Sequence, residues 1–278
     1  MLPSANHVRV NTTGQMLQDF LCAWLRLSRN KAKSLLDSRV VFVNGVRTWM
    51  ARHPLRKGDL VEVFKPNPCP APSLHTIEIL AETKDYLVVN KPAGCLSNGK
   101  GSAETVLQEQ RKESSIRAAH RLDRDTSGCL MMARNQTAME AIIPVFRDNK
   151  VMKMYHALVA GTIAGKEQRI DTPLDGVPAI THIRVLSRGR VACHIAARIE
   201  TGRTHQIRKH LAGIGHPVLG DKQYGTRSPL PDELHRVERQ MLHASSLSLP
   251  SPMDGRRISA EAPLPPDFRS WMKRLRIE

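Results

Sequence analysis

The sequence predicts an α+β protein in which a small N-terminal module precedes a larger body, whose mixed, largely antiparallel sheet is packed against helices. Residues 65–73 read Lys-Pro-Asn-Pro-Cys-Pro-Ala-Pro-Ser, and proline at every second position forces extended backbone and forbids a helix. In the body, strand-like and helical stretches alternate without the regular spacing of a parallel β-α-β array. The 278 residues suffice for two domains with cores of their own. We therefore expect a module over 1–65, a stiff linker over 66–73 and a body over 74–278.

Two helices and a hairpin are expected in the module. Apolar residues recur at helical spacing in the first helix: Met16, Leu17, Phe20, Leu21, Trp24 and Leu25. Ser28 is a suitable N-cap for a second helix, whose apolar residues are Ala32, Leu35 and Leu36. Residues 40–43 and 46–49 read as strands around the tight turn Asn44-Gly45, and residues 60–64 read as a last strand.

The body begins with a buried strand, because the apolar run from Tyr86 to Val89 is followed by a stop at Pro92. A second apolar run over 129–133 predicts another buried strand. A helix is predicted over 136–146. Pro144 inside it should kink or interrupt that helix, since proline has no amide hydrogen and its ring clashes with the preceding turn.

The charge of the chain points to a polyanionic partner. The net charge is +16 and the pI is about 10.1. The module carries 11 lysines and arginines against four acidic residues, so the excess is concentrated there. Such a balance favours a nucleic acid as the first candidate partner and an acidic membrane surface as the second. The cations on and after the second helix are the candidates for phosphate contacts, and they are Arg29, Lys31, Lys33 and Arg39.

The composition also limits the compartment and the class of protein. No apolar run approaches the roughly 18 residues of a membrane span, and no signal peptide opens the chain, so we expect no membrane partner. The five cysteines are scattered and form no Cys-x-x-Cys pair, which favours free thiols in a reducing compartment, the cytoplasm.

The most informative segment is residues 120–128, His-Arg-Leu-Asp-Arg-Asp-Thr-Ser-Gly. Its Asp123 stands between Arg121 and Arg124, immediately before the predicted strand over 129–133. Flanking cations favour the ionised form of a carboxylate. An ionised carboxylate just before a strand can act as a nucleophile or stabilise positive charge, but it cannot donate a proton.

Three further segments of the body carry similar polar signatures. They are 153–161 (Lys-Met-Tyr-His-Ala-Leu-Val-Ala-Gly), 201–221 and 242–244. Together with residues 120–128 they resemble, nearly letter for letter, the pseudouridine synthase family of the large-subunit ribosomal RNA A type, over about 86–268. The module resembles the S4-type RNA-binding domain, although residues 37–39 (Asp-Ser-Arg) stand where that family commonly has a glycine-containing turn.

The resemblance implies an isomerase that detaches uracil from ribose and rejoins it through carbon 5. Asp123 would act at the anomeric carbon, by a covalent ester or by removing a sugar proton. Arg208 would pair with Asp123, Tyr155 would stack on the uracil, and Arg121 would fill the gap left by the flipped base. The remaining positions expected to contact substrate or shape its loop are His120, Arg124, Thr126, Arg203 and His205.

Other interpretations fit the motifs less well. The segment starting at Asp123 begins like a calcium loop, but position twelve is Arg134 instead of glutamate. Residues 94–101 approach a phosphate-binding loop but end in glycine, and His205 and His210 lack the spacing and the glutamate of a zinc site. We expect no metal and no cofactor. The open alternatives are a transfer RNA substrate in place of the favoured ribosomal RNA, a non-catalytic RNA-binding or assembly protein, and an RNA glycosidase or nuclease. We expect a monomer.

Overall fold

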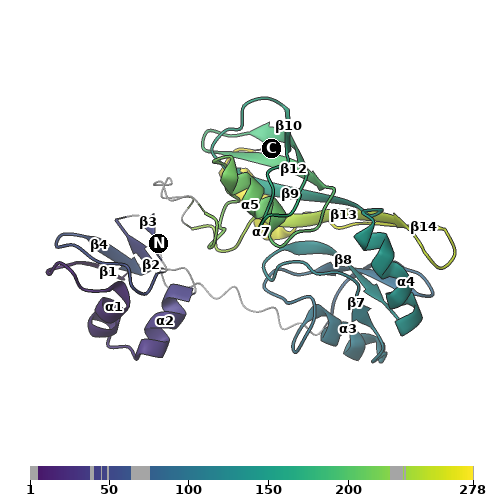
Figure 1. The fold of residues 1–278 in the computed structure, drawn as a ribbon, viewed down its shortest axis with the longest axis horizontal. Coiled ribbons are helices and arrows are strands. Elements are labelled where there is room, and N and C mark those ends of the chain that lie inside the picture. The colour runs from purple at the N-terminus through teal and green to yellow at the C-terminus, as the bar shows by residue number, and fades with distance from the viewer. Residues whose placement is uncertain are drawn as a thin grey trace. The chain divides into compact units, whose positions relative to one another are not determined.

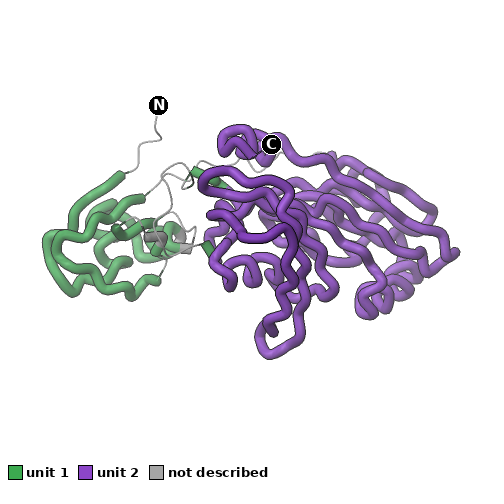
Figure 2. The backbone as a smooth tube through the Cα atoms, turned by 90° about the horizontal axis from the view of Figure 1, so that it is seen from above, with its two compact units in different colours: residues 1–68, 225–238 green, residues 69–224, 239–278 purple. Residues whose placement is uncertain are grey.

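The computed structural model describes residues 6–37, 41–44, 46–48, 50–63, 76–225, 234 and 236–277 (Figure 1). Two compact units divide the chain. The first unit is Met1–Pro68 with Gly225–Glu238, and the second unit is Cys69–Tyr224 with Arg239–Glu278 (Figure 2). The predicted linker over 66–73 lies outside the described residues.

The first unit packs two helices on a small antiparallel sheet. Its elements are β1 (Asn6–Arg9), α1 (Leu17–Leu25), α2 (Arg29–Asp37), β2 (Val41–Val43), β3 (Val46–Arg47) and β4 (Leu60–Val63), with strand order β1-β4-β2-β3. The apolar helix positions predicted from spacing meet the strands in one core, in which Leu17, Leu21 and Leu36 are fully or almost fully buried. The backbone N–H of Lys31 donates to Ser28 Oγ at 3.3 Å, so Ser28 caps α2 as predicted.

The second unit is built on one mixed sheet of ten strands. The strands are β5 (Ile79–Glu82), β6 (Tyr86–Lys91), β7 (Arg117–Ala118), β8 (Ser127–Ala133), β9 (Met152–Ala160), β10 (Glu167–Ile170), β11 (Thr181–Arg188), β12 (Ala192–Ile199), β13 (Leu242–Pro250) and β14 (Arg257–Glu261). The main order is β10-β11-β12-β9-β13-β8-β6-β5, with β14 on β13 and β7 on β8. Among these strands only the β8–β13 pair is parallel. The predicted fold class is therefore confirmed.

Helices cover both faces of this sheet because side chains of a strand alternate between faces. The helices are α3 (Ala103–Arg111), α4 (Gln136–Arg147), α5 (Gln206–Gly213) and α7 (Pro266–Arg274). On β6, Leu87 and Val89 share a core with residues of α3 and α5, whereas Tyr86 and Val88 share another with residues of α4. The pocket described below opens on the first of these faces, which also carries Tyr155.

Pro144 does not end α4, which continues to Arg147. The sequence predicted a kink or an interruption at Pro144, and the interruption is wrong. Pro144 has no N–H to donate to the carbonyl of Glu140, four residues earlier. Both residues are exposed on the outer side of the helix. Water can bind that carbonyl, which removes most of the cost of the missing hydrogen bond.

The parallel contact between β8 and β13 fixes the loop that carries Asp123. Gly128 pairs with Ala244 at the start of β8, with φ of +108°. A β-carbon added at Gly128 would lie 2.1 Å from the carbonyl oxygen of Ala244, so a side chain has no room there. The loop before Gly128 is thus held against a strand that lies more than a hundred residues later in the chain.

Candidate active site

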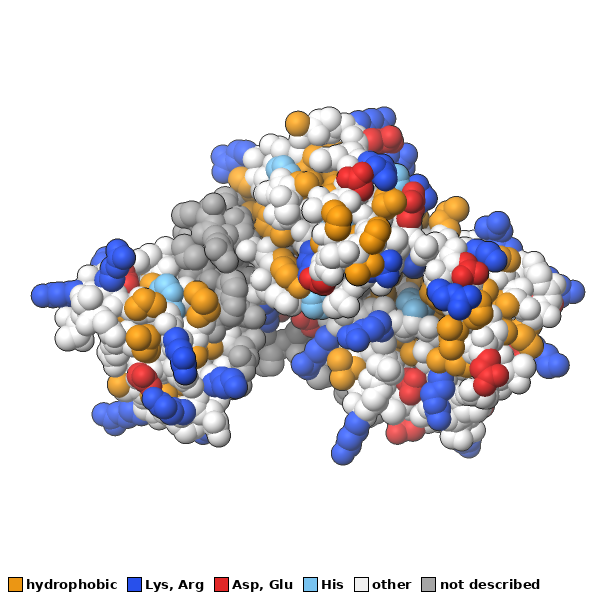
Figure 3. Space-filling view, viewed as in Figure 1, with side chains coloured by type: hydrophobic (Ala, Val, Ile, Leu, Met, Phe, Trp, Pro, Cys, Tyr) orange, Lys and Arg blue, Asp and Glu red, His pale blue; other side chains and the backbone are white. Residues whose placement is uncertain are grey.

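A pocket of about 460 Å³ opens in the second unit beside the loop that carries Asp123. Its walls are the loop 120–126, the end of α4 and the turn 201–205 that leads into α5, and β9 contributes to its floor. Figure 3 shows Lys and Arg side chains around the hollow near the centre of this view. The exposed lining arginines are Arg121, Arg147 and Arg203.

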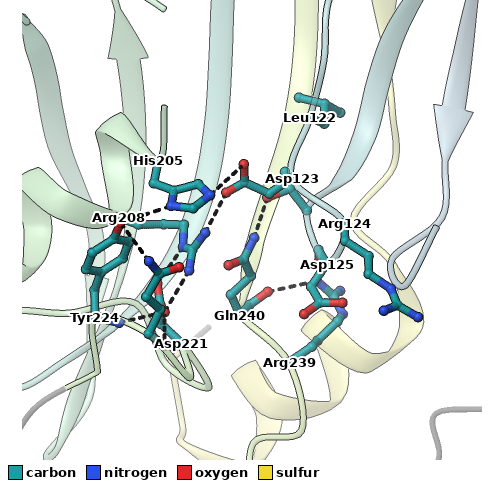
Figure 4. A network of polar contacts seen from close by, with 12 residues as sticks. Leu122, Asp123, Arg124, Asp125, His205, Arg208, Asp221, Tyr224, Arg239 and Gln240 are labelled. Carbon is teal, nitrogen blue, oxygen red and sulfur yellow. Dashed lines mark hydrogen bonds and ion pairs between the residues drawn. The ribbon is translucent and has the colours of Figure 1, made fainter. Parts of the chain in front are cut away.

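Asp123 is held in this pocket by a chain of charged contacts (Figure 4). Arg208 Nη1 donates to Asp123 Oδ2 at 2.8 Å. On its other edge, Arg208 binds Asp221 through two hydrogen bonds, Nε to Oδ2 at 2.6 Å and Nη2 to Oδ1 at 2.9 Å. The backbone N–H groups of Gln223 and Tyr224 also donate to Asp221 Oδ1, at 2.9 and 3.0 Å. Asp221 thereby fixes the guanidinium plane, and the guanidinium orients Asp123.

The electrostatics of this chain keep Arg208 charged in a buried place. Burial alone would lower the pKa of Arg208, but the hydrogen bonds and charges of Asp221 and Asp123 outweigh burial and raise it. For Asp221, burial raises the pKa, and the contacts with Arg208 outweigh this and lower it. The Arg208 guanidinium also lies 5.0 Å from the centre of the Tyr224 ring. One cation therefore serves two carboxylates, one of them open to the pocket.

His205 faces the second oxygen of Asp123. Its Nε2 lies 3.6 Å from Asp123 Oδ1, and its Nδ1 lies 3.0 Å from the Tyr224 hydroxyl. Burial lowers the pKa of His205, against the opposing influence of Asp123. Oδ1 is thus less firmly engaged than Oδ2 and is the oxygen better placed to meet a substrate.

Side chains of Lys91, Gln240 and Arg239 hold the Asp123 loop from behind. The buried Lys91 Nζ donates to the carbonyls of Pro92, Cys95 and Arg124 at 3.0, 2.7 and 3.0 Å. Gln240 donates to Thr126 Oγ1 at 2.6 Å, and Arg239 donates to the Asp125 carbonyl at 3.1 Å. Burial lowers the pKa of Lys91 to about 8. The loop is thus fixed by side chains from β6 and from the segment before β13.

The pocket floor is formed in part by strand β9. Lys153 and Tyr155 are two residues apart, so both side chains lie on one face of β9, and both line the pocket. Burial first, and the Asp123 carboxylate second, raise the pKa of Tyr155, so its ring is neutral. A neutral aromatic ring close to an anionic carboxylate can stack against a base that enters the pocket.

Of the remaining residues predicted for the site, three line the pocket and one points away from Asp123. Thr126 and His120 line the pocket, and His120 Nε2 accepts from the backbone N–H of Met131 at 3.1 Å. Arg203 lines it too, while its Nε donates to the Pro178 carbonyl at 3.1 Å. Arg124 points away from Asp123, and its Nε donates to the Gly94 carbonyl at 3.1 Å.

The flanking cations of the motif are therefore not the ones that contact the Asp123 carboxylate in the described structure. Arg121 is exposed and Arg124 turns outward, whereas Arg208, 85 positions along the chain, makes the contact. Neighbours in an extended loop point in different directions, so adjacency in sequence was a poor guide to contact.

The four cations predicted for phosphate contacts belong to the first unit. Arg29, Lys31 and Lys33 are exposed on α2, and Arg29 pairs with Asp19 at 2.6 Å. Arg39 lies outside the described residues.

Sequence reasoning assigned no role to several residues that complete the site. They are Lys91, Lys153, Asp221, Tyr224 and Gln240. Lys91 and Lys153 had one available signal, since each is a lysine beside or within an apolar strand. Asp221 follows the segment Val218-Leu219-Gly220, but nothing in the sequence indicates that it faces Arg208.

The described residues contain neither a metal-binding cluster nor a membrane-spanning helix. No group of three or more His, Cys, Asp or Glu side chains is placed to hold a metal ion there. Within the same described part of the chain, no helix is both long and apolar enough to cross a membrane. The four described cysteines are free thiols, as predicted.

Comparisons with known proteins agree on one family. A family model described as RNA pseudouridylate synthase matches residues 85–213. The chain is 32% identical to ribosomal large subunit pseudouridine synthase D of Haemophilus ducreyi, over 90% of this chain and 87% of that one. It is 33% identical to an uncharacterized RNA pseudouridine synthase of Bacillus subtilis, over 90% of each chain. A solved structure, human RNA pseudouridylate synthase domain containing 1, matches with a TM-score of 0.58 and 26% identity, over 73% of this chain and 96% of that one.

The chain therefore belongs to the RNA pseudouridine synthase family. Members of this family are isomerases that convert uridine in RNA to pseudouridine, and the resemblance found in the four sequence motifs is confirmed. The fold agrees as well, since human RNA pseudouridylate synthase domain containing 4 shares it with a TM-score of 0.62 at 23% identity, over 72% of this chain and 94% of that one.

Proposed function

We propose that this enzyme isomerises a uridine of large-subunit ribosomal RNA, with Asp123 as the catalytic residue. The observation that carries the proposal is the Asp123 carboxylate in a pocket, held at 2.8 Å by a buried arginine. Relatives named ribosomal large subunit pseudouridine synthase D support the choice of RNA. The net charge of +16 supports a polyanionic substrate of either RNA class, so transfer RNA is the second candidate.

Asp123 acts at carbon 1′ of the ribose. Breaking the bond between this carbon and uracil builds positive charge on the sugar, which an ionised carboxylate stabilises or captures. Arg208 occupies Oδ2 and fixes the carboxylate plane, so Oδ1 meets the sugar. Both the covalent route and the route through a sugar proton use a carboxylate in this position.

Uracil reaches the pocket by leaving the RNA stack. Extrusion of a base costs a few kcal/mol, and stacking on an aromatic ring returns about 1–3 kcal/mol. Tyr155 on the floor supplies that ring, and the exposed Arg121 at the rim is long enough to fill the vacated place in the stack. Arg124, Arg203, His120, Thr126 and His205 contact the flanking RNA or shape the loop.

The first unit acts as an S4-type RNA-binding module. Two helices packed on a small sheet, with the exposed cations Arg29, Lys31 and Lys33 on α2, support this role. Its cations bind phosphates and add affinity without taking part in the reaction. We place the enzyme in the cytoplasm, in keeping with its free thiols and a ribosomal RNA target, and we expect it to act as a monomer.

Mapping of pseudouridines in total RNA tests the proposed target. RNA from cells with and without the gene is compared site by site, and the gene is then restored with either the wild-type or the Asp123→Asn sequence. We expect a pseudouridine in large-subunit ribosomal RNA that disappears without the gene and returns only with the wild-type sequence. A missing site in transfer RNA alone would overturn the ribosomal target, and restoration by Asp123→Asn would overturn the role of Asp123.

A further inference from the structure

Two buried lysines of the second unit differ in how their ammonium groups are satisfied. Lys91 is 0% exposed and gives its three protons to three backbone carbonyls. Lys153 is 8% exposed and lines the pocket, and its ammonium makes no hydrogen bond or ion pair with the described residues, although it is not sealed from solvent in the way that the unpaired Ser187 hydroxyl is. A buried cation without a partner is costly, whereas one with three acceptors is not. The contrast suggests that Lys153 is kept for a partner that the protein chain does not contain.

The position of Lys153 shows where that partner would lie. A β-carbon added at Gly202 would be 3.7 Å from Lys153 Nζ, so the ammonium lies against the turn 201–205. On the other side its charge lowers the pKa of His120, after the larger effect of burial. Lys153 therefore crosses the floor between two pocket walls, next to Tyr155 on the same face of β9.

A phosphate is not the best match for this position. The rim of the pocket has the exposed Arg147 and Arg203, which can bind phosphates that remain in contact with water. The floor lies beside the Tyr155 ring, where the base would stack. Uracil has two carbonyl oxygens at its edge, either of which can accept a hydrogen bond from an ammonium.

We infer that Lys153 donates to a carbonyl oxygen of the target uracil and stabilises the negative charge that uracil acquires as it leaves the ribose, an inference that rests on the proposed function of Asp123. In this step the bond between N1 and carbon 1′ breaks, and its electron pair stays with uracil, spread over N1 and the two carbonyl oxygens. Carbon 1′ becomes electron-poor and faces Asp123. After uracil turns, carbon 5 bonds to carbon 1′, the proton of carbon 5 goes to solvent, and N1 takes up a proton. No oxidant, reductant or further reactant is needed.

Side chains of opposite charge would act on the two parts of the reacting nucleotide, the sugar and the base. The anionic Asp123 meets the sugar, and the cationic Lys153 meets the base, from adjoining parts of one pocket. A fixed cation directed at developing charge in a place with little water is an effective form of catalysis. It also explains why a cation is retained at a buried position that lowers its pKa.

The test compares Lys153→Met and Lys153→Arg with the wild-type enzyme on a transcript of the RNA region found by the mapping experiment. Each enzyme is given a transcript with uridine and one with 5-fluorouridine, whose fluorine makes the base a better leaving group. Consumption of the original nucleoside is followed at saturating enzyme by chromatography of digested RNA. We expect Lys153→Met to lose about 100-fold in rate on uridine and only about tenfold on 5-fluorouridine. Lys153→Arg should recover part of the loss.

Three controls separate this role from others. Affinity for the transcript should change by less than about threefold, because most binding comes from other cations. Lys166→Met, which removes the same charge from an exposed position, should keep the wild-type rate. Without RNA, Lys153→Met should melt at a higher temperature than the wild type, because an unpaired buried charge has been removed. A lysine with only a structural role would give a lower melting temperature.

The outcomes distinguish the inference from the proposal on which it rests. An unchanged rate for Lys153→Met would overturn the inference, and so would an equal loss on both transcripts. A loss confined to affinity would assign Lys153 to a phosphate and would also overturn it. Asp123→Asn is measured in parallel, and its full activity would contradict the proposed function whatever Lys153→Met does.

Discussion

Asp123 is the residue on which the proposed chemistry depends, and its charge can be removed while its shape is kept. In Asp123→Asn we expect isomerisation to fall by roughly 1,000-fold or more, because no carboxylate remains to meet the electron-poor sugar. RNA affinity should be almost unchanged, since it comes from cations. Release of tritium from carbon 5 of labelled uridine measures the reaction.

Asp125→Asn is the matched control for this prediction, because it makes the same change two residues away in the same loop. The Asp125 side chain points away from Asp123, and its carbonyl is the group that Arg239 binds. We expect Asp125→Asn to keep most of the activity. Equal losses in the two variants would mean that the charge of the loop, and not Asp123 itself, is required.

Buried histidines make the second unit sensitive to acid, and His243 is the clearest case. His243 is 0% exposed, and burial lowers its pKa to about 4. Its Nδ1 lies 2.9 Å from Ser127 Oγ, and its Nε2 lies 3.1 Å from the Ala262 carbonyl. The unfolded chain takes up this proton near pH 6.5 and the folded chain does so only near pH 4. The stability that comes from the neutral ring is therefore complete above pH 6.5 and is lost as the pH falls towards 4.

Urea unfolding of wild type and His243→Gln at pH 7 and pH 5 measures this contribution. Over that range the free energy of unfolding of the wild type should fall more steeply, by up to about 1.4 kcal/mol per pH unit for one proton. Groups that titrate equally in both proteins contribute equally to the two pH dependences, so their contributions cancel when the two free energies of unfolding are subtracted. Identical pH slopes for the two proteins would show that His243 takes up its proton equally in the folded and unfolded states.

Among the elements, the contact of β8 with β13 supports the loop that carries Asp123. Gly128→Ala places a methyl group where the Ala244 carbonyl lies, at a φ of +108° that suits only glycine. We expect a loss of about 3 kcal/mol or more in the free energy of unfolding, together with a loss of activity, since the strands must separate. Chemical unfolding and the tritium assay measure the two effects.

Gly213→Ala in α5 is the control for Gly128→Ala. Gly213 has no positive φ, and nothing lies within 4 Å of an added β-carbon. The free energy of unfolding should stay the same or rise by up to about 1 kcal/mol, because alanine favours a helix. If both substitutions had the same effect, the close approach of β8 and β13 would not be the cause.

The elements that could be predicted from the sequence are those with a strong local pattern. The apolar spacing that includes Leu17 and Leu21 gave α1, and the uninterrupted apolar runs gave β6 and β8. Strand β1 was missed because its four residues, Asn-His-Val-Arg, are short and mostly polar. The predicted interruption at Pro144 was wrong because the cost of a proline in a helix depends on whether water reaches the carbonyl that loses its hydrogen bond. The sequence does not show whether that carbonyl is exposed.

The candidate site was predictable only where a motif placed its residues together. Asp123 followed from its own segment, and Arg208 and Tyr155 followed from resemblance. The second partner of Arg208, Asp221, and the two buried lysines depend on which strands become neighbours in the folded sheet. A lysine in a sequence is expected to be exposed. Their burial is a property of the tertiary structure, and its one local signal, a lysine beside or within an apolar strand, does not show which contacts the ammonium makes.

At the scale of the whole molecule, recognition and chemistry are assigned to different units. The site residues discussed above all lie in the second unit, so removal of residues 1–65 should leave the rate at saturating RNA nearly unchanged. Affinity should fall, because up to 11 cations are lost. If three or four of them touch phosphate, the slope of log affinity against log salt should flatten by roughly 2–4 units.

The full-length chain with Arg29→Gln, Lys31→Gln and Lys33→Gln is the companion to this truncation. It keeps the first unit and removes three exposed cations of α2. If α2 faces the RNA, this variant should reproduce much of the flattening. An unchanged salt slope in the truncated protein would show that the first unit does not bind the substrate, and its basic face would then be available to another partner.

The pairing of distant segments has a consequence for synthesis of the protein. Asp123 and Arg208 are 85 positions apart, and Ser127 and His243 are 116 apart. A ribosome that adds about 5–20 residues per second needs roughly 6–24 seconds to proceed from Asp123 to Ala244. During that time the nascent chain has Asp123 but neither β13 beside its loop nor, at first, Arg208, which orients its carboxylate. The enzyme therefore cannot modify RNA near the ribosome that is making it until most of the chain has emerged.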